Sequence, residues 1–204
     1  MSEPPELTTA PDLLVLLDPA AEPDDDGSVA DEHIIGGWEV DADGATGRFL
    51  PNPEHVPSGP DVPSDPVDAV LRGMARSETD GEELLAALGD LDLAIGHDET
   101  GSVVVAPGPD GVHCVLAATA LRHCGPAAAA ADPTVDEWRF CSVGELVEVL
   151  PTQGIDVLLN PLGPAPMRIT AADLRKVTQG AAAGAGEGDV AAPQTGSAGP
   201  PGTS

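Results

Sequence analysis

The first apolar run of the chain predicts a short buried strand. Leu13 to Leu17 are apolar without interruption, and Asp18-Pro19 ends the run. A continuous apolar run is typical of a strand that is covered on both faces. Residues 18–32 are rich in aspartate and broken by proline, so we expect a solvated loop there.

The next apolar segments predict a β-hairpin. Residues 34–40 and 45–50 have strand character, and the Asp-Gly pair at 43–44 favours a two-residue type I′ turn between them. This register places Trp38 directly across from Phe49 as an aromatic cross-strand pair. If the two rings are buried they belong to the core, and if exposed they mark a binding face.

A proline-rich connector and a helix follow the hairpin. Residues 51–66 contain six prolines, which favours an extended linker. Asp65 suits the N-cap and Pro66 the first turn of a helix over residues 66–76. Apolar side chains recur on one face of that helix, as expected of a helix that packs on a core.

From residue 81 the pattern is that of a packed domain with alternating elements. Ser142 with Glu145, and Thr170 with Asp173, have the spacing of helix N-caps. The predicted order is helix 82–88, strands 91–95, 102–105 and 112–117, helix 118–123, an Ala-rich loop at 127–131, strand 137–141, helix 142–150, strands 155–159 and 167–169, and helix 170–177.

These elements predict an α+β protein with a small mixed or antiparallel sheet and helices packed on it. Residues 12–80 form an N-terminal arm with the strand, the hairpin, the connector and one helix. The α+β domain spans residues 81–178. Residues 1–11 and 179–204 are predicted to be disordered, because the tail is mostly Gly, Ala, Pro, Ser and Thr and cannot bury enough apolar surface.

Charge narrows the classes of partner. The 204 residues carry 35 acids and 8 Lys or Arg, a formal net charge of −27. The first 80 residues alone hold 19 acids and 3 bases, net −16. Such a field repels phosphate, so nucleic acid and anionic membranes are disfavoured. A protein partner should be basic or should present polar and apolar surface, although the acids also serve solubility.

Targeting signals are missing from the sequence. The N-terminal residues lack a basic region followed by an apolar one, and no segment is long and apolar enough to span a membrane. We therefore expect a cytoplasmic protein.

Catalytic motifs are also missing. The sequence has no phosphate-binding loop, no dinucleotide fingerprint and no nucleophile elbow. Asp41 and Asp43 open a segment like a calcium loop, but its glycine is at the fourth position instead of the sixth and it has no glutamate at the twelfth, and a hairpin turn explains the same residues. No cofactor is expected.

One cluster has residue types that bind metals. His113-Cys114, His123-Cys124 and Cys141 offer imidazole and thiolate ligands, although without the paired spacing of zinc sites. Neighbouring strand residues point to opposite faces, so His113 and Cys114 do not easily serve one ion. An odd number of cysteines argues against a disulfide framework. A small-molecule or metal site here is the alternative to a binding protein.

Three segments of the arm resemble the actinobacterial type VII secretion system-associated proteins. They are Gly36-Gly37-Trp38-Glu39-Val40-Asp41-Ala42-Asp43-Gly44, Gly47-Arg48-Phe49-Leu50-Pro51-Asn52-Pro53 and Ser64-Asp65-Pro66-Val67-Asp68-Ala69. The elements through residue 123, the helix 142–150 and Val157-Leu158-Leu159-Asn160-Pro161 resemble the SseB-type N-terminal domain of the same proteins.

The resemblance implies a non-enzymatic accessory that binds a component or cargo of a type VII secretion system. No catalytic or cofactor-binding residue comes with it. Exported substrates of that route carry a Trp-x-Gly turn and a tyrosine-containing signal, which this chain lacks, so an accessory fits better than a substrate. The residues that carry the resemblance, and that we expect to take part in an interaction, are Gly37, Trp38, Asp41, Gly44, Phe49, Asn52, Pro53, Asp65, Pro66, Asn160 and Pro161.

Overall fold

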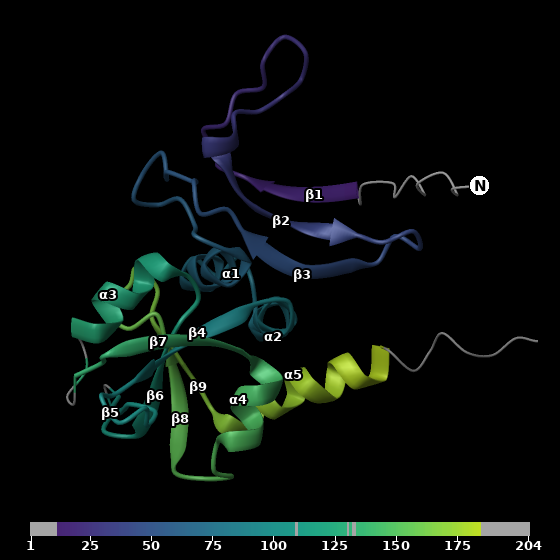
Figure 1. Ribbon diagram of the computed structural model, residues 1–204. Helices are drawn as coiled ribbons and strands as arrows, with labels where there is room; N and C mark the ends of the chain where they lie inside the picture. The colour runs from purple at the N-terminus through teal and green to yellow at the C-terminus, as the bar shows by residue number, and fades with distance from the viewer. Residues whose placement is uncertain (1–11, 109, 130, 132–133, 185–204) are drawn as a thin grey trace, which may run out of the picture.

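The computed structural model describes residues 12–184, except 109, 130 and 132–133. These residues form an α+β fold with a three-stranded antiparallel sheet, a six-stranded mixed sheet and five α-helices, which confirms the predicted class. Figure 1 shows the small sheet above helices α1 and α2, with the large sheet below them. The predictions of disorder for residues 1–11 and 185–204 concern segments outside the described residues.

The small sheet consists of β1 (Asp12–Leu17), β2 (Ile34–Val40) and β3 (Thr46–Pro51), with a short 3-10 helix, η1 (Asp31–His33), before β2. Its strand order is β1-β2-β3, so the hairpin is joined by the first strand and not by the large sheet. The predicted pair is confirmed: Trp38 lies across from Phe49, with ring centroids 4.9 Å apart in an edge-to-face arrangement.

The hairpin turn is longer than predicted. Val40 pairs with Thr46, so the two-residue turn at 43–44 is wrong. The N–H of Gly44 donates to the carbonyl of Asp41 at 3.0 Å, and Gly44 has a φ of +82°. A type I turn followed by a left-handed glycine is the usual three-residue hairpin connection, and it adds the bulge that restores the register at Trp38.

The prediction that the first strand is buried is also wrong. Leu13 and Leu14 of β1 are 57 % and 53 % exposed, because β1 is an edge strand. The continuous apolar run predicts a short buried strand. Among the described residues, β2 is the only strand that pairs with it.

The large sheet has the strand order β7-β4-β6-β8-β9, with β5 (Val105–Pro107) paired to β6. The parallel pair β6·β8 joins strands that are distant in sequence. The other strands of this path are β4 (Asp92–His97), β6 (His113–Ala118), β7 (Glu137–Ser142), β8 (Ile155–Leu159) and β9 (Met167–Ile169).

Helix starts follow the local capping chemistry. Asp65 caps α1 (Pro66–Ala75), and Ser142 with Glu145 forms a capping box on α4 (Val143–Val149), as predicted. Asp80 and Glu83 form a second box at α2 (Gly81–Gly89), which was not predicted.

Three predicted boundaries are wrong. Helix α3 (Leu121–Ala129) starts later than predicted and includes part of the predicted Ala-rich loop, because Ala118 belongs to β6 and alanine favours helix. Helix α5 (Ala171–Gly184) continues past residue 178, where the tail was expected to begin. The predicted strand at 102–105 is reduced to an isolated bridge at Val103 before β5.

One core unites the small sheet with the large one. Ile35 and Phe49 lie in the same apolar cluster as Leu71 of α1, Leu88 of α2 and Leu159 of β8. The N–H of Phe49 also donates to the carbonyl of Asp90 at 2.8 Å. The inner face of the small sheet is therefore held against the helices by side chains and by backbone.

Candidate functional site

Two glycines in β2 let the small sheet pack closely. A Cβ atom at Gly36 would clash with Cζ of Phe49, and one at Gly37 would lie 2.8 Å from the carbonyl oxygen of Leu14. Neither position has room for a side chain. Gly37, a predicted interaction residue, is itself buried, so its role in the structure is to allow this approach.

The two glycines also mark the two faces of the sheet. The Phe49 ring lies where a Gly36 side chain would point, on the inner face toward α1 and α2. Leu13 lies where a Gly37 side chain would point, with its Cγ 3.3 Å from the Cβ position, so it belongs to the outer face. Trp38 and Phe49 share the inner face and pack on the core, which makes them core residues.

The outer face is apolar and open to solvent. Val15, Gly37 and Leu50 form one row across the three strands, and the Leu13 side chain covers the glycine in that row. Leu13 and Leu17 flank Val15 along β1 by strand alternation. We call Leu13, Val15, Leu17 and Leu50 the outer apolar patch.

An exposed face of this composition is unusual. Antiparallel sheets that cover a core on one side normally carry polar residues on the other. Contiguous exposed apolar surface in a soluble protein marks an interaction site more often than a scattered leucine does. The outer apolar patch is therefore the candidate functional site.

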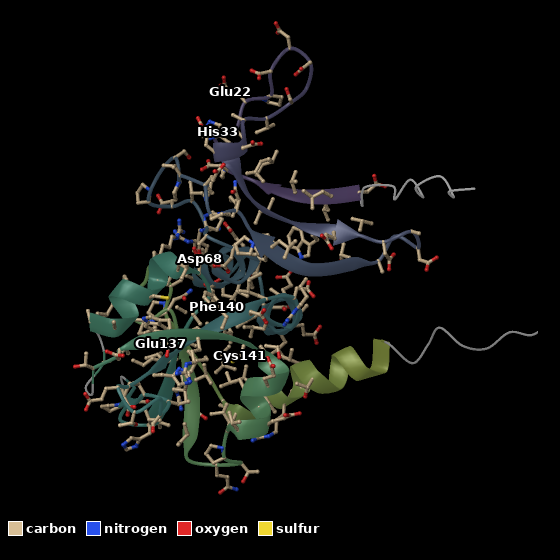
Figure 2. The ribbon with its side chains drawn as sticks, viewed as in Figure 1. Glu22, His33, Asp68, Glu137, Phe140 and Cys141 are labelled. Carbon is tan, nitrogen blue, oxygen red and sulfur yellow. The ribbon has the colours of Figure 1, made fainter. Side chains whose placement is uncertain are left out.

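Acidic side chains lie at both ends of this patch. Asp41 and Asp43 are exposed in the hairpin turn, and Glu39 lies across from Leu13. At the other end, the loop after β1 exposes Glu22 and residues 24–26, all aspartates. Figure 2 labels Glu22 on this loop, which projects above the sheet. Arg48 is the single Lys or Arg between residues 12 and 56.

Asn52 links the segment after β3 to η1 and β2 by hydrogen bonds. Its Nδ2 donates to the carbonyls of Asp31 and Ile34 at 2.8 and 2.9 Å, and its backbone N–H donates to Ile35. Pro53 follows in an exposed turn. Asn52 is thus a structural residue that ties the connector to β2.

Asp18, the residue after β1, is buried and links this strand to the connector by hydrogen bonds. Its carboxylate accepts hydrogen bonds from the N–H and hydroxyl of Ser58 and from the N–H of Ala20, and His55 lies 3.4 Å away. Burial alone would raise the pKa of Asp18, but the bonds from Ser58 and Ala20 outweigh it and hold the pKa far below its usual value.

This lowered pKa predicts a loss of stability in acid. The folded state binds the proton of Asp18 more weakly than the unfolded chain does, so the stabilisation is present above about pH 4 and is lost as the pH falls below it. Urea unfolding of the wild type and of Asp18→Asn at pH 7 and pH 3 measures this. The variant should be less stable at pH 7 and should lose less on acidification, and parallel losses would contradict the prediction.

A buried polar network joins α1 to the large sheet. Asp65 accepts hydrogen bonds from the hydroxyls of Ser64 and Thr119 at 2.6 and 2.7 Å and from the N–H of Asp68 at 2.8 Å. Asp65 is fully buried. The N-cap predicted from sequence therefore also binds the loop after β6. Pro66 begins the helix behind it.

Asn160, the residue after β8, completes this network. Its Oδ1 accepts from the N–H of Thr119 at 2.9 Å, and its Nδ2 donates to the hydroxyl of the same residue. Asn160 is buried with a φ of +45°, a left-handed conformation that asparagine tolerates better than most residues. Asn160 and the buried Pro161 thus shape the point where the parallel strands end.

Asp68 carries the charged part of the network. Its Oδ2 accepts from the N–H of Ser64 at 2.9 Å, from Nε of Arg72 at 3.1 Å and from Nη2 of Arg122 at 3.1 Å. His123 lies further away, with Nε2 at 3.8 Å. Figure 2 shows Asp68 where α1 approaches α3.

The two buried carboxyls have opposite pKa shifts. Burial raises the pKa of Asp65, and the neighbouring charge of Asp68 adds to this despite the hydrogen bonds from Ser64 and Thr119. Burial would also raise the pKa of Asp68, but His123, the N–H of Ser64 and the charge of Arg72 outweigh it and hold the pKa well below its usual value. The two carboxyls of the network therefore differ in pKa although both are buried.

Ser64, His123 and Asp68 do not form a catalytic triad. The Ser64 hydroxyl is 2.8 Å from Nε2 of His123, and that same nitrogen is the one nearest Asp68. A triad base binds the nucleophile and the carboxylate through different nitrogens. All three side chains are also buried, which keeps a substrate away.

The cysteine and histidine cluster is dispersed in the structure. His113 is exposed at the start of β6, while Cys114 and Cys124 pack in separate apolar clusters. Burial raises the pKa of all three thiols, that of Cys141 to about 11. Within the described part of the chain, no three His, Cys, Asp or Glu side chains are placed to hold a metal ion.

Several residues of the outer apolar patch and of the buried polar network were not predicted from the sequence. The spacing of Asp68 and Arg72, four apart on a helix, signalled their ion pair. Thr119 and Arg122 gave no signal, because their partners lie 54 residues away. For Leu50 the signal was its exposed strand position beside Phe49, which alternation places on the opposite face.

Comparisons with protein families, with curated proteins and with solved structures found no match. The resemblance to type VII secretion system-associated proteins therefore stays a prediction. Over the residues that the structure describes, no helix has the length and apolar character to cross a bilayer.

Proposed function

We propose that the protein is a non-enzymatic interaction protein that binds another protein through the outer apolar patch. The observation that carries the proposal is the row of Val15, Gly37 and Leu50, an apolar surface on the open face of the small sheet. Side chains of a partner can remove this surface from water at about 25 cal/mol per Å².

The rest of the chain supports a binding role over catalysis. The Ser64–His123–Asp68 group lacks triad geometry, and the raised pKa of each thiol disfavours a thiolate at neutral pH. The surrounding acids favour a partner with positive charge near an apolar segment.

The proposed partner is a component or cargo of a type VII secretion system. This part of the proposal rests on the sequence resemblance alone. In that setting the protein acts inside the cell as an accessory, with no cofactor and no nucleic acid.

Affinity capture from a native lysate tests the proposal. The wild type should enrich secretion components. The double variant Leu13→Ser/Leu50→Ser should capture at least about tenfold less of these components. Both side chains are more than half exposed, so their replacement leaves the core intact. The matched control is Leu121→Ser/Val149→Ser, which removes two apolar side chains that are 69 % and 72 % exposed elsewhere.

The outcomes separate the two parts of the proposal. If the wild type enriches no secretion component, the secretion link is wrong. If both double variants capture the same proteins as the wild type, the outer apolar patch is not the binding surface.

A further inference from the structure

The β1 strand has the sequence of an interior strand in the position of an edge strand. Its residues after Asp12 are all apolar, which is typical of a strand that is covered on both faces. Natural edge strands are usually short, charged or interrupted by proline, since an open edge pairs with other chains. Within β1 none of these protections is present after Asp12.

Apolar side chains on both faces of β1 are exposed, which also indicates that this strand lacks a neighbour at one edge among the described residues. Leu13 and Val15 are exposed on the outer face, and Leu14 is 53 % exposed on the inner face beside Trp38. A partner that only covered the outer face would leave Leu14 in water. A strand paired to the edge of β1 that no described strand occupies would bring side chains to both faces at once.

We propose that β1 is the docking edge for an extended basic segment of another protein, which adds to the small sheet as a fourth strand. This inference rests on the proposed protein-binding function and names its mode and chemistry. Backbone hydrogen bonds to the open edge give affinity in such complexes, and alternate side chains give specificity.

The charges around the edge select a basic occupant. Exposed Asp41 and Asp43 lie toward one end of β1, and Glu22 with residues 24–26 lies beyond the other, as Figure 2 shows for Glu22. Lysine or arginine residues at both ends of an apolar strand would complement them. A second copy of this chain would bring another net charge of −27 to the same edge, which disfavours self-pairing.

Peptide binding to the full-length protein tests the inference. The probe is a capped peptide of about eight residues, a usual strand length, that alternates lysine with valine. One control peptide replaces lysine with glutamate, and the other keeps lysine but carries methyl groups on alternate backbone nitrogens. Fluorescence anisotropy reports affinity, and amide hydrogen exchange by NMR reports which strand is protected.

The basic peptide should bind at least about tenfold more tightly than either control, with an affinity that falls as salt rises. It should protect amides of β1 and leave those of β7, which is at one edge of the large sheet, unchanged. Val15→Lys should weaken binding about tenfold by like-charge repulsion, whereas Val149→Lys, an exposed position on α4, should not.

Several results would overturn the inference. Equal affinity for the basic and acidic peptides would show that charge does not select the occupant. Equal affinity for the basic peptide and its methylated form would show that the peptide does not pair with β1 as a strand. Protection of β1 that rises with protein concentration alone would assign the edge to a second copy. Protection without peptide that disappears on deletion of residues 1–11 would assign it to the chain itself.

Failure of this inference can be told apart from failure of the proposed function. Capture of secretion components that depends on Leu50, without protection of β1 by the basic peptide, would keep the function and overturn strand addition. Pairing of the peptide without such capture would keep the docking edge and overturn the secretion link.

Discussion

Replacing Asp68 with alanine is expected to lower the free energy of unfolding by about 3 to 5 kcal/mol. Arg72 is 8 % exposed and has its carboxylate partner in Asp68, and Arg122 donates to the same oxygen. The alanine variant leaves the guanidinium of Arg72 buried without that negative charge. The cost of an uncompensated buried charge exceeds the modest net value of the intact pair.

Urea unfolding at pH 7 measures this loss. The matched control is Glu78→Ala, which removes the carboxylate of an ion pair with Arg76 in which both side chains are 58 % exposed. That surface pair is worth about 1 kcal/mol at most. Similar losses in the two variants would show that burial of the Asp68 network contributes nothing.

Replacing Phe49 with alanine is expected to cost about 3 to 5 kcal/mol, because a buried ring is lost and a cavity remains. Phe49 is 4 % exposed and contacts both the Trp38 ring and the shared core. The chain provides its own control, since its other phenylalanine, Phe140, is 51 % exposed on β7. Phe140→Ala should cost about 1 kcal/mol at most.

The two tryptophans report on the two sheets separately. Trp38 lies in the small sheet and Trp138 in β7 of the large one, so single-tryptophan variants follow each sheet during unfolding. Since Ile35 and Phe49 share a core with α1 and α2, Phe49→Ala should shift both fluorescence transitions together. A shift of the Trp38 signal alone would show that the small sheet unfolds as an independent unit.

Features that depend on neighbours in sequence were predictable. The caps at Asp65 and Ser142 need only a residue three positions later, and the structure confirms both. The Trp38–Phe49 pair followed from the hairpin pattern. The turn was wrong by one residue, because Asp-Gly also fits the type I turn with a left-handed glycine seen at Gly44.

Features that depend on distant residues were not predictable. Ser64 and His123 are 59 residues apart in sequence and 2.8 Å apart in space, and no local pattern indicates that meeting. The outer apolar patch was missed for a different reason. Hydrophobicity alone suggested that Leu13 to Leu17 are buried, whereas burial depends on which strands are available to cover β1.

The core shared by the two sheets has a consequence for synthesis of the chain. The segment with β1, β2 and β3 leaves the ribosome before Leu84 and Leu88 of α2, which belong to the same apolar core. At about 5 to 20 residues per second, the apolar strands wait for seconds without these core residues. The net charge of −16 on the first 80 residues gives neighbouring nascent chains on a polysome a mutual repulsion that opposes pairing through β1.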